Sequence, residues 1–155
     1  MLLQFATGEP FATGVAPYVY QPVSSRETAH RVILNVQIGS FPTQAYLDTG
    51  AVYLVCAPEI AKVLGLRPTD KLEDERLVFR GRVYQGGLYR LPLTFVAGYG
   101  ESLEIEVTAF IPHLHLEDEW PIEFPCIAGM SGCMERLRFA LDPLDENIYF
   151  GQITA

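Results

Sequence analysis

The sequence is poor in cysteine and in positive charge, and it has no long apolar run. Three of its 155 residues are cysteines, and 11 Lys and Arg stand against 19 Asp and Glu, for a formal net charge of −8. The positive residues are not clustered, which argues against nucleic acid or an anionic membrane as the main partner. No stretch approaches the ~18 apolar residues of a membrane-spanning helix, and the first residues lack a secretory signal pattern. We therefore expect a soluble, cytoplasmic protein.

The few cysteines also exclude a disulfide framework. Cys56, Cys126 and Cys133 are odd in number, lie in apolar surroundings and show no Cys-x-x-Cys spacing. This pattern is typical of buried free thiols in a reducing compartment.

The length and the 49% share of hydrophobic residues suit one domain with one core. Residues 1–25 contain three prolines and a single charged residue, Glu9, so we expect an irregular N-terminal arm. This arm is too aromatic for a freely solvated tail, and we expect it to pack on the domain or on a second subunit; a partner-binding stripe is the alternative. Its aromatic residues are Phe5, Phe11, Tyr18 and Tyr20. Residues 26–155 then form the domain.

Alternating apolar and polar side chains predict that this domain is mainly β. The predicted strands cover residues 30–38, 45–47, 52–56, 76–79, 82–96, 103–111 and 147–152, with a short apolar run at 125–129. Gly86, Gly87 and Pro92 predict breaks in the long strand at 82–96. A short helix is predicted over residues 59–64 and a helical turn or two over 132–138, while residues 69–75 are expected to be a charged surface link. No internal repeat is present.

The residues that carry chemistry are Leu47-Asp48-Thr49-Gly50-Ala51, at the end of a short apolar strand. A carboxylate that activates water must be held rigidly, and Gly50 lets backbone amides approach Asp48 closely. The Thr49 hydroxyl can tie the loop to a neighbour by a hydrogen bond. Two such carboxylates sharing one proton supply a general base and a general acid, because two charges ~3 Å apart cannot both be ionised cheaply.

The chain supplies this motif once. Asp142, the other aspartate in an apolar context, is followed by Pro143 and does not form a tight catalytic loop. The second carboxylate must then come from a second chain, through a two-fold axis that places Asp48 beside its own copy. The motif therefore predicts a homodimer.

The order of elements around this motif resembles that of the retropepsin-like aspartic proteases, in their bacterial single-domain type, over most of residues 30–152. Four segments carry the resemblance: the strand and turn at 32–38, the motif around Asp48, the glycine-bearing hairpin at Phe79-Arg80-Gly81, and Cys126-Ile127-Ala128-Gly129-Met130. Residues 132–150 look like the closing helix and strand of bacterial members. Met130-Ser131 departs from the charged residue that often follows the second glycine, and the N-terminal arm is longer than the terminal strand of retroviral enzymes.

The resemblance implies an all-β, single-domain closed barrel with one or two short helices, which pairs as a two-fold homodimer. It implies an aspartic endopeptidase that hydrolyses a peptide or protein substrate by water attack between two Asp48 carboxylates, without cofactor or metal. By this resemblance Asp48 is catalytic and Thr49, Gly50 and Ala51 support it. The residues assigned to the flap hairpin or to substrate binding are Phe79, Arg80, Gly81, Ile127, Ala128 and Gly129. Ala51 in place of serine removes a hydrogen bond to the carboxylates and implies activity at less acid pH.

Four other interpretations stand beside this one. Asp48 can be a turn aspartate without chemistry, and the glycines near residue 81 can belong to an ordinary bulged hairpin. The fold can also serve as a catalytically silent dimeric scaffold or binding protein. His113 and His115, with the acidic residues 117–119 and a cysteine thiolate, would make a metal module, although a solvated acidic loop explains them without a metal.

Overall fold

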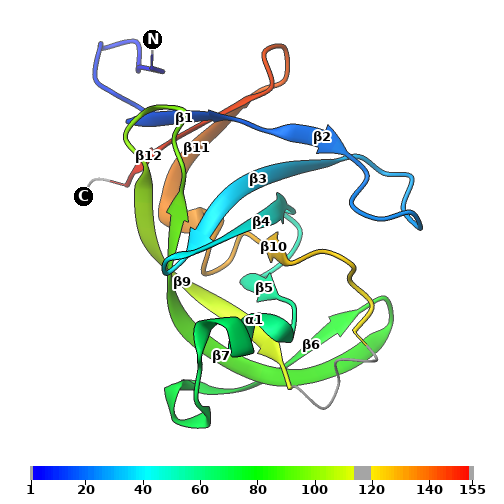
Figure 1. The fold of residues 1–155 in the computed structure, drawn as a ribbon. Coiled ribbons are helices and arrows are strands. Elements are labelled where there is room, and N and C mark those ends of the chain that lie inside the picture. The colour runs from blue at the N-terminus through cyan, green and yellow to red at the C-terminus, as the bar shows by residue number, and fades with distance from the viewer. Residues whose placement is uncertain (1, 114–119, 154–155) are drawn as a thin grey trace.

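The computed structural model describes residues 2–113 and 120–153, and strands dominate it (Figure 1). The strands are β1 (Gly14–Pro17), β2 (Val19–Gln21), β3 (Arg31–Ile38), β4 (Phe41–Leu47), β5 (Leu54–Cys56), β6 (Glu73–Phe79), β7 (Arg82–Phe95), β8 (Tyr99–Gly100), β9 (Leu103–Pro112), β10 (Cys126–Ala128), β11 (Leu137–Asp142) and β12 (Asn147–Gln152). The helical elements are α1 (Glu59–Leu64) and the 3₁₀ turns η1 (Pro68–Asp70) and η3 (Met134–Arg136). In this described part of the chain, no helix has the length and apolar character needed to cross a membrane.

Two sheets organise the molecule. The larger has eight strands in the order β2-β3-β4-β10-β5-β9-β7-β6, and β3 also pairs with β7, so the sheet curls back on itself. The smaller has the order β11-β12-β1-β8 and joins segments from the two ends of the chain, which lie at the same end of the molecule (Figure 1). The prediction of a mainly β fold is confirmed.

Strand β10 lies in the middle of the larger sheet. It runs parallel to β4, with Ala128 opposite Leu47, and antiparallel to β5, with Ala128 opposite Leu54. All three residues of β10 are buried. A strand that is apolar throughout and flanked on both sides suits such a central place. The short apolar run predicted from the sequence is thus the strand that joins β4 to β5.

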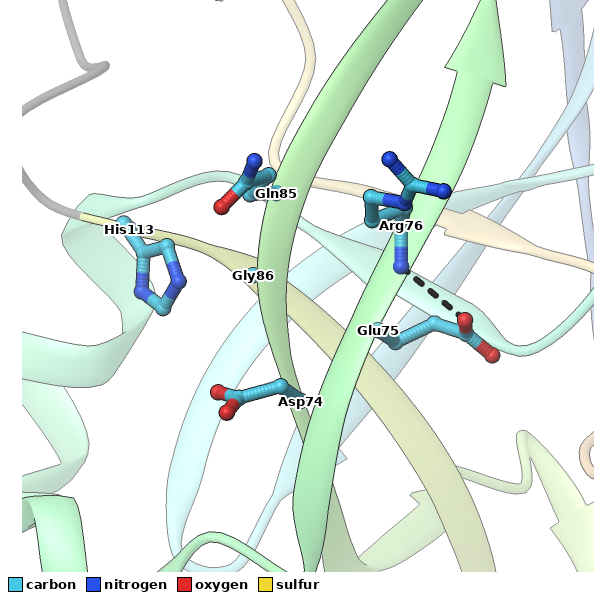
Figure 2. Close-up of a pocket in the computed structure, with 6 residues that line it drawn as sticks. All are labelled: Asp74, Glu75, Arg76, Gln85, Gly86 and His113. Atoms are coloured by element: carbon cyan, nitrogen blue, oxygen red, sulfur yellow. Dashed lines mark hydrogen bonds between the residues drawn. The ribbon is translucent and has the colours of Figure 1, made fainter.

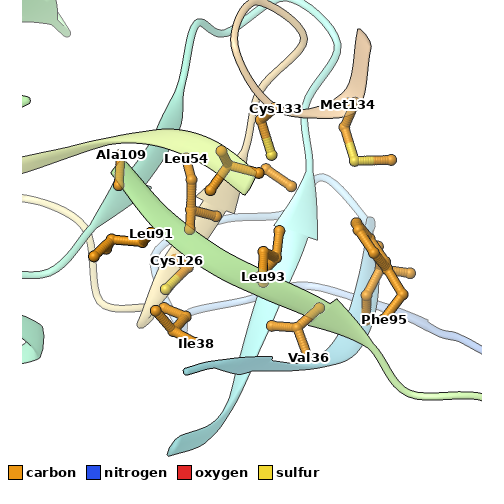
Figure 3. Packing of buried hydrophobic residues seen from close by; sticks show 14 of the residues in the cluster. Val36, Ile38, Leu54, Leu91, Leu93, Phe95, Ala109, Cys126, Cys133 and Met134 are labelled. Carbon is orange, nitrogen blue, oxygen red and sulfur yellow. The ribbon is translucent and has the colours of Figure 1, made fainter. Parts of the chain in front are cut away.

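The side chains of β10 alternate between two apolar clusters. Cys126 and Ala128 face the main core, which also contains Leu54, Leu93 and Phe95 (Figure 3). Ile127, which points to the other face, belongs to a second cluster. The buried members of this second cluster are Ile33, Tyr46, Val55, Leu88, Phe110 and Ile127. Phe79, Trp120 and Ala51 pack partly buried against it, so this cluster lies next to the hairpin tip and the Asp48 loop.

The sequence analysis predicted an irregular N-terminal arm, but part of this arm forms the strands β1 and β2. Strand β1 pairs antiparallel with β12 on one side and with β8 on the other, and β2 pairs with β3. Both strands are short and Pro17 ends the first, so their local pattern is weak. Their partners are mostly distant in the sequence, and a reading of the segment alone does not reveal them.

Other boundaries also differ from the predictions. Strand β6 begins at Glu73, inside the predicted surface link, and β7 runs without a break through Gly86 and Gly87. A Cβ at Gly86 would collide with the Ile111 carbonyl and the Phe110 ring, so this glycine permits close packing rather than a break. The predicted helical turn at 132–138 is limited to η3, because Leu137–Asp142 finds a full ladder of partners in β12. Helix α1 agrees with the prediction, and Gly65 ends it with φ 66°.

The three cysteines are free and buried. The Sγ atoms of Cys56 and Cys126 lie 3.9 Å apart, and this thiol contact together with burial raises the pKa of Cys56 well above its ordinary value. Burial raises the pKa of Cys133 to about 12. All three thiols are buried, and for Cys56 and Cys133 the raised pKa also lowers the share of the reactive thiolate, so these thiols are protected in the folded chain.

We predict that a thiol reagent at neutral pH modifies the folded protein on the order of 100-fold more slowly than free cysteine, because modification must wait for the core to open. The same reagent in denaturant should modify all three cysteines of each chain. Mass spectrometry of the labelled protein measures both. Rapid labelling of Cys56 or Cys126 in native buffer would contradict the packing described above.

Candidate active site

The Asp48 loop follows directly from the end of β4 and is held by backbone hydrogen bonds. The Asp48 N–H donates to the Ala128 carbonyl oxygen at 3.0 Å, and the Ala51 N–H donates to the Asp48 carbonyl oxygen at 3.0 Å. The Gly50 N–H donates to Asp48 Oδ1 at 3.0 Å. The carboxylate is therefore fixed in orientation, while 34% of the side chain stays exposed. A rigid and accessible carboxylate suits general acid–base chemistry.

A second loop, which follows β10, locks against the first. The Gly129 N–H donates to the Tyr53 carbonyl oxygen and the Met130 N–H to the Ala51 carbonyl oxygen, both at 2.8 Å, and the Tyr53 N–H donates to the Ser131 carbonyl oxygen at 2.7 Å. A Cβ on Gly129 would lie 2.6 Å from the Tyr53 oxygen and 2.7 Å from the Ala51 oxygen. The position therefore requires glycine so that the two backbones can approach.

Tyr53 supports the site and was missed in the sequence analysis. Its φ is 64°, in the left-handed region that non-glycine residues seldom adopt, and its hydroxyl donates to Glu75 Oε2 at 2.9 Å. Burial and this hydrogen bond raise the pKa of Tyr53 above its ordinary value, so the hydroxyl stays protonated. Tyr53 thus connects the Asp48 loop to β6. The sequence does not reveal this positive φ, because position 53 is a tyrosine and not a glycine.

The β6–β7 hairpin bends over the Asp48 loop. Its turn residues Arg80 and Gly81 have φ values of 49° and 78°, as in the tight hairpin turns that follow the twist of the strands. A hollow of about 290 Å³ separates the hairpin from the loop. It is lined by Asp48, Gly50, Ala51 and Val52 from the loop, and by Leu77, Val78, Phe79 and Arg80 from the hairpin. The predicted flap residues and the predicted catalytic loop therefore face one space.

Aromatic packing holds the hairpin from its inner side. The Phe79 ring lies 5.6 Å from the Trp120 ring and 6.3 Å from the Tyr84 ring, and Tyr84 and Trp120 are 5.2 Å apart. The two contacts of Trp120 are edge-to-face, and contacts of this kind stabilise a cluster by about 0.5–1.5 kcal/mol per pair beyond burial. Trp120 and Tyr84 were not named as site residues from the sequence, because only the fold brings Trp120 beneath the hairpin.

Charged side chains surround Asp48. Arg31 Nη1 lies 4.0 Å from Asp48 Oδ2, and Arg31 Nε lies 3.8 Å from Glu27 Oε2. The Arg31 guanidinium also covers the Tyr46 ring at 5.0 Å from its centre. Burial, and less strongly the Glu27 and Asp48 carboxylates, raise the pKa of Tyr46, while Arg31 acts in the opposite direction. The sequence analysis missed Arg31 and Glu27, whose one local signal is a charged stretch after the nearly uncharged arm.

The remaining predicted site residues lie in different surroundings. Thr49 is exposed, and its hydroxyl makes no hydrogen bond within residues 2–113 and 120–153. Ile127 and Ala128 are buried beneath the site and do not line the hollow. Gly129 braces the Asp48 loop, as described above. Of the residues assigned to substrate binding, the structure brings only Phe79 and Arg80 to the hollow.

A second hollow, of about 420 Å³, bears on the metal hypothesis (Figure 2). It is lined by Asp74, Glu75, Arg76, Gln85, Gly86 and His113, and Asp48 is not among them. Asp74 is paired with Lys71 at 2.7 Å, and Glu75 Oε1 accepts the Arg76 N–H at 2.9 Å. His115 and the acidic residues 117–119 lie outside the described residues. Within the described ones, no group of three or more His, Cys, Asp or Glu side chains is arranged to hold a metal.

Comparison with known proteins identifies the fold. No protein-family model matches the sequence, and no curated protein matches it. A crystal structure of a retropepsin-like aspartic protease from Rickettsia conorii matches with a TM-score of 0.52 at 16% identity, over 90% of this chain and 95% of that one. The solution structure of the simian foamy virus (mac) protease gives a TM-score of 0.39 at 20% identity, over 64% of this chain and 89% of that one. The chain has a retropepsin-like fold.

We predict that Gly129→Ala destabilises the folded chain by about 2 kcal/mol or more, because the new methyl group collides with two backbone oxygens that cannot move away cheaply. Urea unfolding followed by circular dichroism measures the loss. Gly98→Ala is the matched control, since its Cβ would meet nothing closer than the Pro17 ring at 3.4 Å. Equal stabilities for the two variants would contradict the role assigned to Gly129.

Proposed function

We propose that this protein is an aspartic endopeptidase in which two copies of the chain each contribute Asp48. One observation carries the proposal: a rigidly held, accessible carboxylate faces a hollow beneath a β-hairpin, in a retropepsin-like fold. This arrangement suits an extended peptide lying between Asp48 and the hairpin tip. The curling of the sheet through the β3–β7 pairing supports the closed barrel expected from the sequence.

The proposed chemistry needs two carboxylates that share one proton. The ionised member takes a proton from a water molecule, which attacks the carbonyl carbon of the peptide bond. The protonated member stabilises the developing oxyanion, and a proton then passes to the leaving amide nitrogen. Two carboxylates at ~3 Å hold one proton because both cannot be ionised cheaply. Among the described residues that line the hollow, Asp48 is the only carboxylate, so a second copy must supply the other.

The surface beside Asp48 supports pairing with a second copy. Thr49 and Gly50 are exposed, and the nearby Val52 and Val78 are exposed to 41% and 67%. An apolar surface next to a polar loop favours contact with another protein surface. A two-fold axis through this surface would bring the two Asp48 loops together and would give the free Thr49 hydroxyl a partner across the axis.

We also propose that the protein works in the cytoplasm, where three buried free thiols would remain reduced. Its partner is a peptide or an unfolded protein segment, because an extended chain suits the hollow between the hairpin and the Asp48 loop. The alanine at position 51 supports activity at less acid pH, since it offers no hydroxyl to the carboxylates.

We predict that Asp48→Asn abolishes cleavage of an unfolded protein substrate, with the rate falling by a factor on the order of 10³ or more, because an amide cannot act as a general base. Sedimentation should show that the variant still forms the dimer. The measurement is the cleavage rate across about pH 3 to 8. Cleavage that survives the substitution would remove Asp48 from the mechanism, and a wild-type protein that never cleaves would favour the scaffold.

Mixing the two forms tests whether the site is shared. After subunit exchange in an equal mixture of wild type and Asp48→Asn, about one quarter of the dimers carry Asp48 in both subunits. If each active site needs Asp48 from both subunits, only these dimers are active. The rate per total chain should then fall to about a quarter of the wild-type value. A fall to only one half would mean that each chain works alone and would contradict the shared site.

A further inference from the structure

Glu27 lies between two arginines that come from different parts of the fold. Its Oε1 lies 2.8 Å from Arg80 Nη2, at the tip of the β6–β7 hairpin. Its Oε2 lies 3.8 Å from Arg31 Nε, at the start of β3. The Glu27 side chain is 16% exposed, against 57% for Arg80, so the carboxylate is largely withdrawn from water. An ion pair with one withdrawn partner is screened less by salt than a fully exposed one.

These contacts form a chain of charges from the hairpin tip to the catalytic loop. Arg80 contacts Glu27, Glu27 contacts Arg31, and Arg31 Nη1 lies 4.0 Å from Asp48 Oδ2. The Arg31 guanidinium rests on the Tyr46 ring, which gives it a defined place between the two acids. The tip and the catalytic carboxylate are therefore connected by charge as well as by the hollow between them.

The two contacts of Glu27 are unequal. With Arg80 the contact is a hydrogen bond of 2.8 Å, whereas Glu27 Oε2 and Arg31 Nε are buried and make no hydrogen bond in the described structure. A buried donor and a buried acceptor without partners cost free energy, so the pair gains if it closes from 3.8 Å to bonding distance. Glu27 can thus bind Arg31 more closely once Arg80 leaves.

The backbone at the tip supports a role for the Arg80 side chain. Its φ of 49° suits glycine, asparagine or aspartate, and an arginine there carries a conformational cost. Such a residue persists when its side chain makes a contact that offsets the cost. The Glu27 hydrogen bond is that contact for Arg80.

We propose that Glu27 is the latch of the hairpin: it holds the tip closed over the Asp48 loop through Arg80, and on opening it turns to Arg31. When the hairpin tip is closed, Arg31 remains available to Asp48. When the tip opens, Arg31 moves toward Glu27. For the reaction this makes Glu27 a positioning residue, and that part rests on the proposed protease function. The latch itself is a property of the folded chain whether or not the chain cleaves peptides.

Hydrogen–deuterium exchange followed by mass spectrometry tests the latch without any substrate. Glu27→Gln and Arg80→Gln should each speed the exchange of hairpin amides in residues 77–84 by about three- to tenfold, as the loss of a partly buried charged hydrogen bond predicts. Arg80→Lys, which keeps the charge and the same backbone strain, should retain most of the protection. Peptides from β9 should exchange as in the wild type, which shows that the chain remains folded.

The double variant Glu27→Gln/Arg80→Gln decides whether the two residues act together. If the two residues form one latch, the hairpin of the double variant exchanges no faster than the hairpin of either single variant. The matched control is Glu106→Gln, which breaks the exposed pair with Arg90 at 3.2 Å far from the tip and should leave the hairpin unchanged. Additive effects, or hairpin exchange that stays at the wild-type rate in Arg80→Gln, would overturn the latch.

Cleavage kinetics then separate the latch from the protease proposal. If the wild type cleaves peptides, Glu27→Gln should raise KM several-fold, because the open tip holds a substrate less well. An unchanged KM together with faster hairpin exchange would overturn the positioning role and leave the latch standing. A wild type without activity but with the predicted exchange pattern would overturn the protease and not the latch.

Discussion

The site depends on one feature of the main chain: the insertion of β10 between β4 and β5. This strand is three residues long, and its last residue accepts the N–H of Asp48. The residues that follow it donate to the carbonyls of Tyr53 and Ala51. Each of these backbone groups would cost about 1–3 kcal/mol if it were buried without a partner. The Asp48 loop therefore has a defined shape only when β10 is in place.

Strand β10 and the two clusters on its faces form the floor of the site, and the β6–β7 hairpin covers it. One face belongs to the main core (Figure 3), and the other belongs to the second cluster, which lies beneath the hairpin. The hairpin meets this floor through Leu77 and the Phe79 ring and through the hydrogen bond from Tyr53 to Glu75, and its tip is held by the ion pair of Arg80 with Glu27. Aromatic packing anchors the hairpin where Phe79 lies, while Arg80 and Gly81 extend beyond it. In the proposed latch, the tip moves while the hydrogen bonds of the Asp48 loop keep Asp48 in place.

Much of this could be predicted from local pattern. The motif at Asp48, the helix ended by Gly65, the hairpin with Arg80-Gly81 at its turn and the apolar run at β10 all carry their signals within a few residues. The pairing of β10 could not be predicted, because three apolar residues fit any central strand in either direction. The strands β1 and β2 were missed because both are short, and because the partners of β1 are distant in the sequence. Glu27 and Arg31 were missed because charged residues in and just after a loop are ordinarily solvated.

The place of β10 along the chain has a consequence for biosynthesis. A growing polypeptide that has not yet reached Cys126 has no acceptor for the Asp48 amide and no loop to brace Ala51 and Tyr53. The strands on either side of the gap, β4 and β5, are made early, but they cannot pair with each other through the missing strand. In the proposed protease, a nascent chain would therefore emerge from the ribosome without a formed catalytic loop, and the ability to cut peptides would arise only after residues 126–131 have been made and have paired with the Asp48 loop.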